Sequence, residues 1–489
     1  MIRDYLLLLS WLCAVQGKIG YFWHITDIHY DPRYSAQANA ATACWNTRNG
    51  GVGGGRKTPG KFGDYGCDSP WELVESAAKA MKTYRGEGIE FVLWTGDALT
   101  RTTGMNAELR LQCLRNLTDL LSRTFKGLFV FPVLGHDDTV NFSQLAELWS
   151  TWLPQEALDT LKSAGYYTIE QTSEKYRIIF LNTNLWLNTA DNRMLHHQSG
   201  ASVVDNTQDP LNQWSWFQTT LETARRKEET VYIVGHTPPG VDDRESGASM
   251  LNERHNAKYL QLIRLYSDII RGQFFGHWHT DTFRVVYNDN GLPVSWIMMA
   301  PSISPTTPGG PNNPGLRLYK FETTTGQVLD YTQYYLNLPE ANSGTANWLI
   351  EYSLLEYYSL QEITAISLHD LADRFTQFND YAFVRNRIHF AQRQNSFADA
   401  ADTEKKEEVC SRTYKQHYFI RNPGILPLER KDIRMKRVRF YTQDRIRNIF
   451  VNYFRAVNNQ RGKKFPNRSL GSILDSYFSQ TSNIVESEI

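Results

Sequence analysis

Histidine and aspartate residues occur in five short clusters along this chain, and together they suggest a hydrolytic site that holds two metal ions. The clusters are Asp27-Ile28-His29, Gly96-Asp97, Gly135-His136-Asp137-Asp138, Gly235-His236 and Gly276-His277-Trp278-His279. Two divalent ions about 3.5–4 Å apart need about seven oxygen and imidazole donors, with one carboxylate shared between them. The five clusters supply donors of these types in sufficient number.

A division of these donors between two ions follows from their order. Asp97 is the expected bridge. One ion would be held by Asp27, His29, Asp97 and His279, and the other by Asp97, His236, His277 and a donor from the Gly135 loop. In an Asp-x-His sequence on one strand both side chains point to the same face, so each such pair would hold an ion together. The alternative, that each histidine is an ordinary core or surface residue, suits a single Gly-His pair but not five clusters.

Each cluster follows a short apolar run that is typical of a strand. These expected strands are Tyr21–Ile25, Phe91–Thr95, Leu128–Leu134, Val231–Val234 and Gln273–Phe275. The metal ligands are therefore expected to gather where strands end.

Strand-like and helix-like segments alternate through the first 320 or so residues. Apolar spacing predicts amphipathic helices at Trp71–Tyr84, Glu108–Phe125, Gln213–Arg226 and Asn256–Arg271. Further strands are expected at Phe283–Tyr287, Val294–Met299 and Leu316–Phe321. Strands alternating with helices indicate an α/β fold in which helices cover the outer faces of sheets.

The residues resemble a known family, the calcineurin-like metallophosphoesterases. Within that family they resemble the type 3 branch of the acid sphingomyelinase-like phosphodiesterases, and within the branch the 3b type. The resemblance runs from about Gly20 to about Tyr358 and rests on six segments: Phe22–His29, Gly66–Pro70, Leu93–Asp97, Leu181–Asn184, Val234–His236 and Phe275–Asp281. The resemblance implies two mixed β-sheets packed face to face, with helices on the outside. It also implies that the protein binds two divalent metal ions and that these are zinc. It also implies that the Pro-rich loop Pro301–Pro314 lies close to the metals.

Two departures from the family pattern fall at the chemistry itself. The family reads Gly-Asn-His-Asp at the third cluster, so an ungapped alignment puts His136 in place of the metal-binding Asn and Asp137 in place of a histidine thought to protonate the leaving group. The family also has a second histidine four residues after its bridging Asp, where this chain has Arg101. A one-residue slip in the loop would instead put His136 in the donor's place and leave the Asn unreplaced.

Each departure has a physical consequence. Imidazole binds zinc well, so His136 is expected to act as a ligand. Nearby dications lower the pKa of an aspartate, which makes Asp137 a poor proton donor. Arg101 keeps its proton at all relevant pH values, but its planar fork can clamp phosphate oxygens. The site should bind phosphate better than it donates protons.

The start of the chain predicts secretion. Met1–Gly17 has one arginine, an apolar run and small residues near its end, as in a signal peptide cut near Gly17. In an oxidising compartment Cys44 and Cys67 can close a Gly-rich loop, a pairing that the resemblance supports, whereas Cys113 and Cys410 have no argued partner. Glycosylation sequons occur at Asn116, Asn141 and Asn467. The expected location is extracellular, with the lysosome as the alternative.

The organisation that follows is a signal peptide at 1–17, a catalytic domain at 18–341, a C-terminal helical module at 342–420 and a basic tail at 421–489. Helices of the module are expected at Trp348–Tyr358 and Ser367–Asn379. The tail has 14 Lys and Arg residues against 6 Asp and Glu residues. It is interpreted as a solvated segment, with attraction to anionic membrane lipids as the sharper alternative. No membrane-spanning run or lipid-anchor signal is expected.

Two functions compete on this sequence. The first is a secreted, zinc-dependent hydrolase of phosphoric esters. The family resemblance suggests nucleotide phosphodiesters or sphingomyelin-type phospholipids as its substrates. The second is a metal-binding pseudoenzyme that recognises a phosphorylated ligand or a membrane without turnover, and Arg101 and Asp137 favour it. The 52 basic residues balance the 52 acidic ones, and the main body has no basic stripe, so a nucleic-acid partner is not expected.

Overall fold

The computed structural model describes residues 18–375, except 41–42, 46–57, 85–87, 102–104, 139, 172–174, 188–207, 241–249 and 307–310, and also Asp380 and Ala382. Most of these residues belong to one compact unit, Met1–Ala372 with Arg387–Arg421. A second unit comprises Asp373–Asn386 and Asn422–Ile489, and in it Arg374 pairs with Asp380. The expected signal peptide, Cys410, Asn467 and the basic tail lie outside the described residues.

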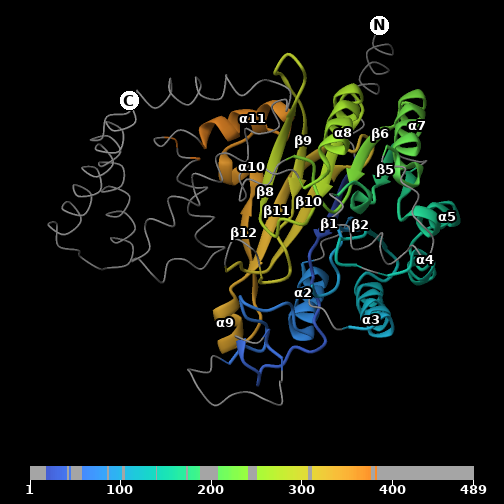
Figure 1. Ribbon diagram of the computed structural model, residues 1–489. Coiled ribbons are helices and arrows are strands. Elements are labelled where there is room, and N and C mark those ends of the chain that lie inside the picture. The colour runs from blue at the N-terminus through green and yellow to red at the C-terminus, as the bar shows by residue number, and fades with distance from the viewer. Residues whose placement is uncertain are drawn as a thin grey trace, which may run out of the picture. The chain divides into compact units, whose positions relative to one another are not determined.

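Two mixed sheets of six strands each form the centre of the fold (Figure 1). The first sheet has the order β12 (Trp348–Ser353), β11 (Val328–Leu336), β10 (Gly315–Glu322), β1 (Ile19–Ile25), β2 (Ile89–Trp94) and β3 (Phe129–Pro132). The second has the order β4 (Tyr167–Gln171), β5 (Tyr176–Phe180), β6 (Thr230–Val234), β7 (Ile270–Phe275), β9 (Pro293–Met299) and β8 (Thr282–Tyr287). The fold predicted from the sequence is therefore confirmed.

The strands that precede the five clusters lie side by side and run in parallel within each sheet. In the first sheet β2 pairs with β1 on one side and β3 on the other, and in the second sheet β6 pairs with β7. Parallel neighbours bring their carboxyl ends to one edge of the sheet, and ligands bind at that edge in open α/β sheets. The expectation that the clusters follow strand ends is confirmed.

Aromatic side chains pack the two sheets against each other. The ring of Phe22 on β1 stacks on Phe91 and on Tyr319, with centroids 4.9 Å apart in each pair. On its other side Phe22 meets the edge of Phe274 from β7 of the second sheet, with centroids 5.4 Å apart. Offset and edge-on aromatic pairs of this kind add to the free energy gained by burial. The two sheets are thus held together by aromatic packing between β1 and β7.

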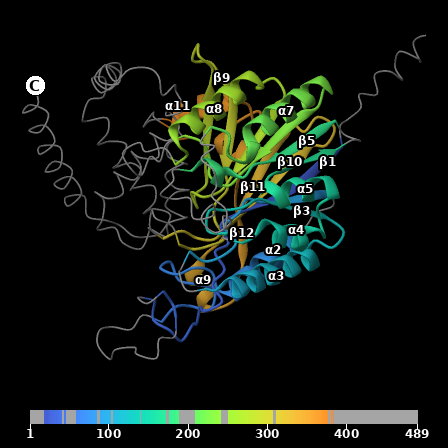
Figure 2. The ribbon, with the colours of Figure 1, turned by 45° about the vertical axis from the view of Figure 1, so that its right-hand side comes forward.

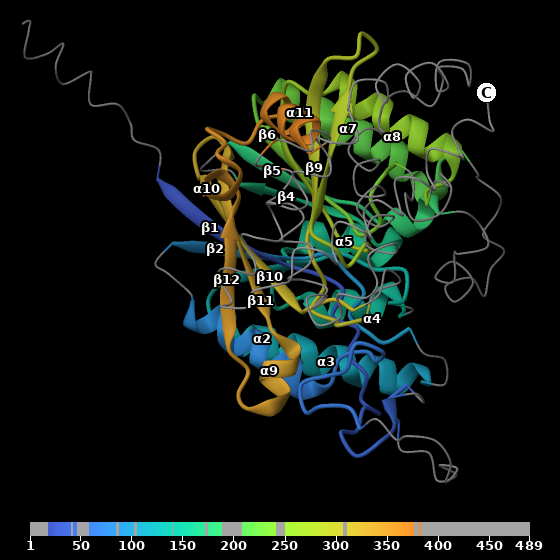
Figure 3. The ribbon, with the colours of Figure 1, turned by 90° about the vertical axis from the view of Figure 1, so that its left-hand side faces the viewer.

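Helices cover the two outer faces, as Figures 2 and 3 show from different sides. The helices α2 (Trp71–Thr83) and α3 (Ala107–Thr124) lie on the first sheet, and α7 (Gln213–Arg226) and α8 (Glu253–Leu265) lie on the second. Asn106 caps α3 by accepting a hydrogen bond from the backbone N–H of Leu109, and this type of cap explains why the helix begins there. In the described part of the chain no helix is both long and apolar enough to cross a membrane.

Shorter helices complete the fold at its edges. They are α4 (Phe142–Trp149), α5 (Gln155–Ala164), the 3-10 turns η2 (Thr183–Trp186) and η3 (Pro210–Asn212), α9 (Leu338–Ser343), α10 (Leu354–Tyr358) and α11 (Ala365–Arg374). The first two pack on each other beyond β3, and Gly165 ends α5 in a left-handed conformation (φ 77°) that glycine adopts without strain.

Three expected elements differ from the structure. Trp348–Tyr358, expected as a helix, is strand β12 followed by the single turn α10, because pairing with β11 supplies hydrogen bonds that override the helical spacing. The first sheet therefore extends past the expected boundary at residue 341. The helix expected to reach Arg271 ends at Leu265, and β7 begins at Ile270. The helix expected at Ser367–Asn379 is α11, and residues 376–379 lie outside the described ones.

Candidate metal centre

The five clusters converge at the seam between the two sheets. Asp27 and His29 follow β1, Asp97 follows β2, and His136 follows β3, all in the first sheet. The second sheet supplies His236 after β6 and the pair His277 and His279 after β7. Seven side chains from five loops therefore meet in one place, although 252 positions separate the first from the last.

The first group of donors consists of Asp27, His29 and His279. The Nε2 atom of His279 lies 3.3 Å from Asp27 Oδ1, and the Nε2 atom of His29 lies 3.8 Å from the same oxygen. The two imidazole Nε2 atoms are 3.1 Å apart. All three side chains are buried, and their ligand atoms point at a common centre, as the donors of one metal ion would.

The second group consists of Asp97, His136, His236 and His277. The Oδ2 atom of Asp97 lies 3.0 Å from His136 Nδ1 and 3.2 Å from His236 Nε2. The Nδ1 atom of His277 lies 3.3 Å from His236 Nε2. One carboxylate and three imidazoles form a donor set typical of zinc.

Asp97 connects the two groups. Its Oδ2 atom faces the second group and also lies 3.6 Å from His29 Nε2 of the first. Its Oδ1 atom accepts a hydrogen bond from the backbone N–H of Asp137 (3.0 Å). This arrangement gives Asp97 the geometry of a bridge between two ions.

Two buried oxygens indicate that a cation fits here. Among the described residues Asp27 Oδ1 and Asp97 Oδ2 have no hydrogen-bond partner, although both are shielded from solvent. A buried carboxylate oxygen without a partner is costly, and a bound ion is one of the few things that satisfies it. The residues present therefore fit the metal ions.

Electrostatics in the cluster favours ionised carboxylates. Burial alone would raise the pKa of Asp97, but the facing imidazoles of His136 and His236 outweigh it and hold the pKa well below its usual range. The pKa of Asp27 is likewise held low against burial, chiefly by His279. Carboxylates kept ionised in this way are ready to bind a cation.

The ligand-bearing loops have an unusual backbone that the sequence did not reveal. Asp27, His29, Asp97, His277 and His279 have φ values between 47° and 72°, in the left-handed region. Residues other than glycine are rare there, and such strain concentrates at functional sites. The Asp-x-His pairs thus converge through left-handed turns after the strands, and the expectation that they share one face of a strand was wrong, because β1 and β7 have already ended.

Backbone carbonyls fix which nitrogen two of the imidazoles present. His279 Nδ1 donates to the carbonyl oxygen of Thr306 (2.5 Å), and His236 Nδ1 donates to that of Thr95 (2.7 Å). In the neutral form of each ring, Nε2 therefore carries the lone pair that faces the cluster. The nearby carboxylate of Asp281 pairs with the buried Arg317 and accepts a hydrogen bond from Tyr352.

The described residues of the loop at 301–314, which are 301–306 and 311–314, lie against the cluster, as the resemblance implies. In addition to the Thr306 contact, Asn312 Nδ2 donates to the carbonyl oxygen of His279 (2.8 Å). The backbone N–H of Ser304 donates to the carbonyl oxygen of Asp27 (3.0 Å). This loop therefore holds both ends of the first donor group.

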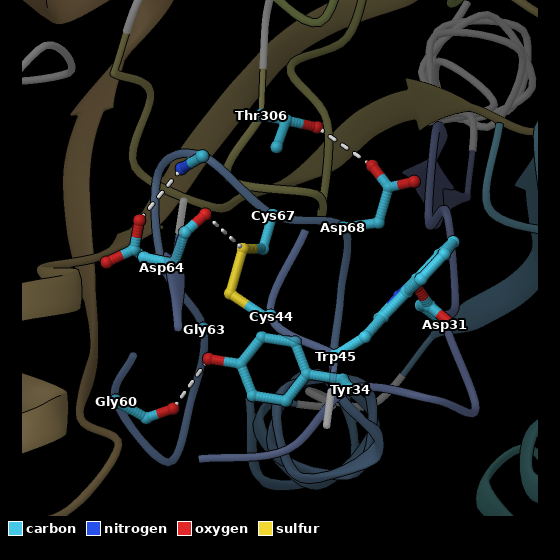
Figure 4. The surroundings of a disulfide bond; sticks show 12 residues. Asp31, Tyr34, Cys44, Trp45, Gly60, Gly63, Asp64, Cys67, Asp68 and Thr306 are labelled. Carbon is cyan, nitrogen blue, oxygen red and sulfur yellow. Dashed lines mark hydrogen bonds between the residues drawn. A yellow bond between two sulfur atoms is a disulfide. The ribbon is translucent and has the colours of Figure 1, made fainter. Parts of the chain in front are cut away.

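A disulfide joins Cys44 to Cys67, and Figure 4 shows it together with Asp68 and Thr306. The next residue, Asp68, accepts from Thr306 Oγ1 (3.0 Å) through Oδ1 and from Thr100 Oγ1 (2.5 Å) through Oδ2. Asp68 was missed as a site residue, although it belongs to a segment that carries the resemblance. The disulfide is therefore connected to His279 through Asp68 and Thr306.

A second supporting carboxylate, Asp138, also had no assigned role. Its two oxygens accept from the backbone N–H groups of Ala98 (2.8 Å) and Gly135 (2.9 Å). Burial, followed by the nearby charge of Asp97, raises its pKa to about 6. It ties the loop after β3 to the loop after β2.

The three residues that make up the two departures from the family pattern, Arg101, His136 and Asp137, all face the cluster. His136 presents Nδ1 to the second donor group. Asp137 Oδ2 lies 3.5 Å from His136 Nε2 and 3.6 Å from Arg101 Nε. A guanidinium nitrogen of Arg101 lies 2.6 Å from His279 Nε2.

Other predicted residues lie away from the cluster. Asn116 is in α3, and its sequon partner Thr118 is buried. Asn141 caps α4 by accepting from the backbone N–H of Ser143. Cys113, which is free among the described cysteines, is buried in α3.

Comparison with known proteins yields two matching family models. The model of calcineurin-like phosphoesterases matches residues 20–281, which include all five clusters, and that of the acid sphingomyelin phosphodiesterase C-terminal region matches residues 293–419. The chain is 34% identical over 411 residues to cyclic GMP-AMP phosphodiesterase SMPDL3A of Bos taurus, which covers 80% of this chain and 88% of that protein.

Two further relatives have similar identity. Acid sphingomyelinase-like phosphodiesterase 3b of Homo sapiens is 34% identical over 397 residues, covering 75% of this chain and 83% of that protein. Sphingomyelinase phosphodiesterase C of Dictyostelium discoideum is 33% identical over 392 residues, covering 74% and 83%. All three are similar to this chain over most of their own length.

Proposed function

This chain belongs to the calcineurin-like phosphoesterase family, and from that premise we propose that it hydrolyses phosphodiesters with two zinc ions. The observation that supports this most directly is the pair of donor groups with Asp97, a member of the second, only 3.6 Å from His29 of the first. In the proposal Asp27, His29, Asp97 and His279 hold one ion, and Asp97, His136, His236 and His277 hold the other.

The metal ions would polarise the phosphoryl group and promote attack by water. The protein's own side chains would orient the substrate. Arg101 is about a third exposed and lies at the edge of the cluster, where its fork can contact phosphate oxygens. Asp97 and Asp27 would stay ionised and keep the two ions at a fixed separation.

Protonation of the leaving group would be weak in this chain. Carboxyl groups normally ionise far below neutral pH and guanidinium groups keep their proton, so Asp137 and Arg101 replace potential donors with poor ones. General acid assistance is worth roughly a hundred- to ten-thousand-fold. Substrates with good leaving groups should therefore be favoured.

The relatives' names suggest the substrate class. Cyclic GMP-AMP and sphingomyelin, which appear in those names, both carry phosphodiester bonds. We propose a small nucleotide phosphodiester or a choline-type phospholipid as the substrate. A secreted or lysosomal location is proposed from the N-terminal sequence, and contact of the basic tail with anionic lipids is proposed from its charge.

The proposal is tested by comparing two ester classes. Zinc-reconstituted protein should bind two ions per chain and hydrolyse nitrophenyl phosphodiesters measurably but natural phosphodiesters poorly. The variant Arg101→His with His136→Asn and Asp137→His should raise hydrolysis of natural esters far more than that of aryl esters. Equal gains on both would show that the substitutions act through metal binding or loop geometry.

A second candidate function is that of a metal-binding pseudoenzyme. The contact between Arg101 and His279 favours the pseudoenzyme, because the guanidinium group already occupies the Nε2 atom with which His279 would bind a metal ion. Under this alternative neither ester class is hydrolysed before or after the three substitutions, while phosphate still binds. Less than one ion per reconstituted chain would rule out both functions.

A further inference from the structure

We infer that Arg101 competes with a metal ion for His279, so that the two metal sites fill unequally and a bound phosphate group relieves the competition. The inference rests on the proposed function, because it concerns the same two donor groups. The inference adds a regulatory role for Arg101. Through this residue, phosphate and the second metal ion would bind cooperatively.

The competition follows from the hydrogen bonds of one imidazole ring. His279 Nδ1 donates to the carbonyl oxygen of Thr306, so the single lone pair of the neutral ring is on Nε2. A guanidinium group can only donate hydrogen bonds, and a nitrogen of Arg101 lies 2.6 Å from that Nε2 atom. A metal ion needs the same lone pair. His279 can therefore bind Arg101 or the ion, but not both.

Charge acts in the same direction. Arg101 brings a full positive charge to the group formed by Asp27, His29 and His279, and its closest carboxylate, Asp137 Oδ2, lies 3.6 Å from its Nε atom. A second cation must enter this group against that charge. The group therefore binds its ion more weakly than the same residues would with a neutral side chain at position 101.

The other donor group lacks this obstacle. Within the described residues, the nitrogens of His236 face the Thr95 carbonyl, Asp97 and two imidazoles. His277 Nδ1 faces His236, and no arginine contact with either ring is found there. The first ion should therefore fill the group of Asp97, His136, His236 and His277.

Arg101 is placed so that its fork can leave His279 while its backbone stays fixed. Its backbone N–H donates to Asp68 Oδ2 (3.3 Å), which is itself held by Thr100. The side chain is 36% exposed, so phosphate can reach the guanidinium from solvent. Bidentate binding to phosphate would replace the contact with His279 and free its lone pair.

The test measures zinc binding and not turnover. Metal-free full-length protein is titrated with zinc by calorimetry, with and without inorganic phosphate, and compared with Arg101→Leu. In the natural protein the Kd of the second ion should be at least about fivefold higher than that of the first. Phosphate should reduce this difference in Kd. In Arg101→Leu the second ion should already bind tightly without phosphate, and the effect of phosphate should shrink.

Two further variants are the controls. Arg110→Leu removes the same charge from a side chain that donates to the carbonyl oxygen of Asp137 but does not contact His279. In this variant the second ion should still bind weakly. Arg101→Lys keeps the charge without the planar fork, and it should reduce the effect of phosphate.

Three results would overturn the inference: equal affinities for both ions in the natural protein, an Arg101→Leu titration that matches that of Arg110→Leu, or no effect of phosphate on the second ion. Failure of the proposed function would look different. In that case no variant, including Arg101→Leu, would bind a second ion under any condition.

Discussion

The loops that carry the metal ligands depend on close backbone contact between neighbouring clusters. A Cβ atom at Gly135 would lie 2.1 Å from both the backbone nitrogen and Oδ1 of Asp97. Glycine is therefore required at this position for steric reasons alone. The left-handed backbone of Asp97 (φ 50°) adds strain that the surrounding hydrogen bonds must offset.

This crowding predicts the effect of a single methyl group. Gly135→Ala should push Asp97 out of its bridging position, lower the free energy of unfolding by about 1–3 kcal/mol and reduce zinc binding to less than two ions per chain. Elemental analysis and urea unfolding measure the two effects. Gly66→Ala is the matched control, since its Cβ would meet nothing closer than 3.5 Å. Full zinc content in Gly135→Ala would contradict the prediction.

Residue types at the centre were predictable from the sequence, but their orientation was not. All the predicted ligands, Asp27, His29, Asp97, His136, His236, His277 and His279, lie together because metal donors recur in recognisable clusters. The acceptors of the imidazole N–H groups are backbone carbonyls of Thr95 and Thr306. No side-chain pattern marks a carbonyl, so this part of the site could not be predicted.

Among the secondary-structure elements, the sequence predicted best those whose conformation depends on interactions within the element. The helix at Gln213–Arg226 was expected with the bounds it has, because its apolar spacing agrees with its packing on the second sheet. Strand β12 was mistaken for a helix, since its conformation depends on pairing with β11. Helices α4 and α5 were not expected at all.

An ion-pair network at the edge of the second sheet predicts a pH effect. Lys227, and then Arg177, lower the pKa of Glu170 to about 2 against the opposing effect of burial, from an ordinary value of 4.5. Because the folded pKa is the lower one, the stabilisation is present above pH 4.5 and is lost as the pH falls from 4.5 towards 2. Glu170 is about a third exposed, so the effect should stay below about 1 kcal/mol.

Glu170→Gln should therefore flatten the fall of the free energy of unfolding between these pH values, as measured by urea titrations at several acid pH values. The control Glu228→Gln removes the same charge from a side chain that is 84% exposed. An identical acid dependence in Glu170→Gln and the natural protein would show that the network does not contribute.

At the scale of the whole molecule, the metal centre joins the two sheets. The backbone N–H of His277, after β7, donates to Asp27 Oδ2 (2.8 Å), after β1. Ions that bind ligands from both sheets should therefore oppose their separation. A ligand that binds only the folded protein stabilises it by an amount set by its concentration and Kd.

Metal removal should accordingly destabilise the entire fold. At free zinc about 100 times Kd the free energy of unfolding should exceed that of chelated protein by about 2.7 kcal/mol. Calorimetric scans with and without chelator measure this difference, and Asp27→Asn combined with His236→Ala should abolish it. Chelator that removes the zinc without changing Tm would show that the sheets hold together independently of the ions.

The bond between Cys44 and Cys67 has a practical consequence for anyone producing this protein. Because Asp68 follows the bond directly and supports Thr306, material made in a reducing cytosol should bind zinc poorly even in a zinc-rich culture. The order of refolding steps should then affect the yield of loaded protein. Oxidation in a glutathione buffer before zinc is added should give fuller occupancy than the reverse order, in which the ions meet free thiolates that compete for them.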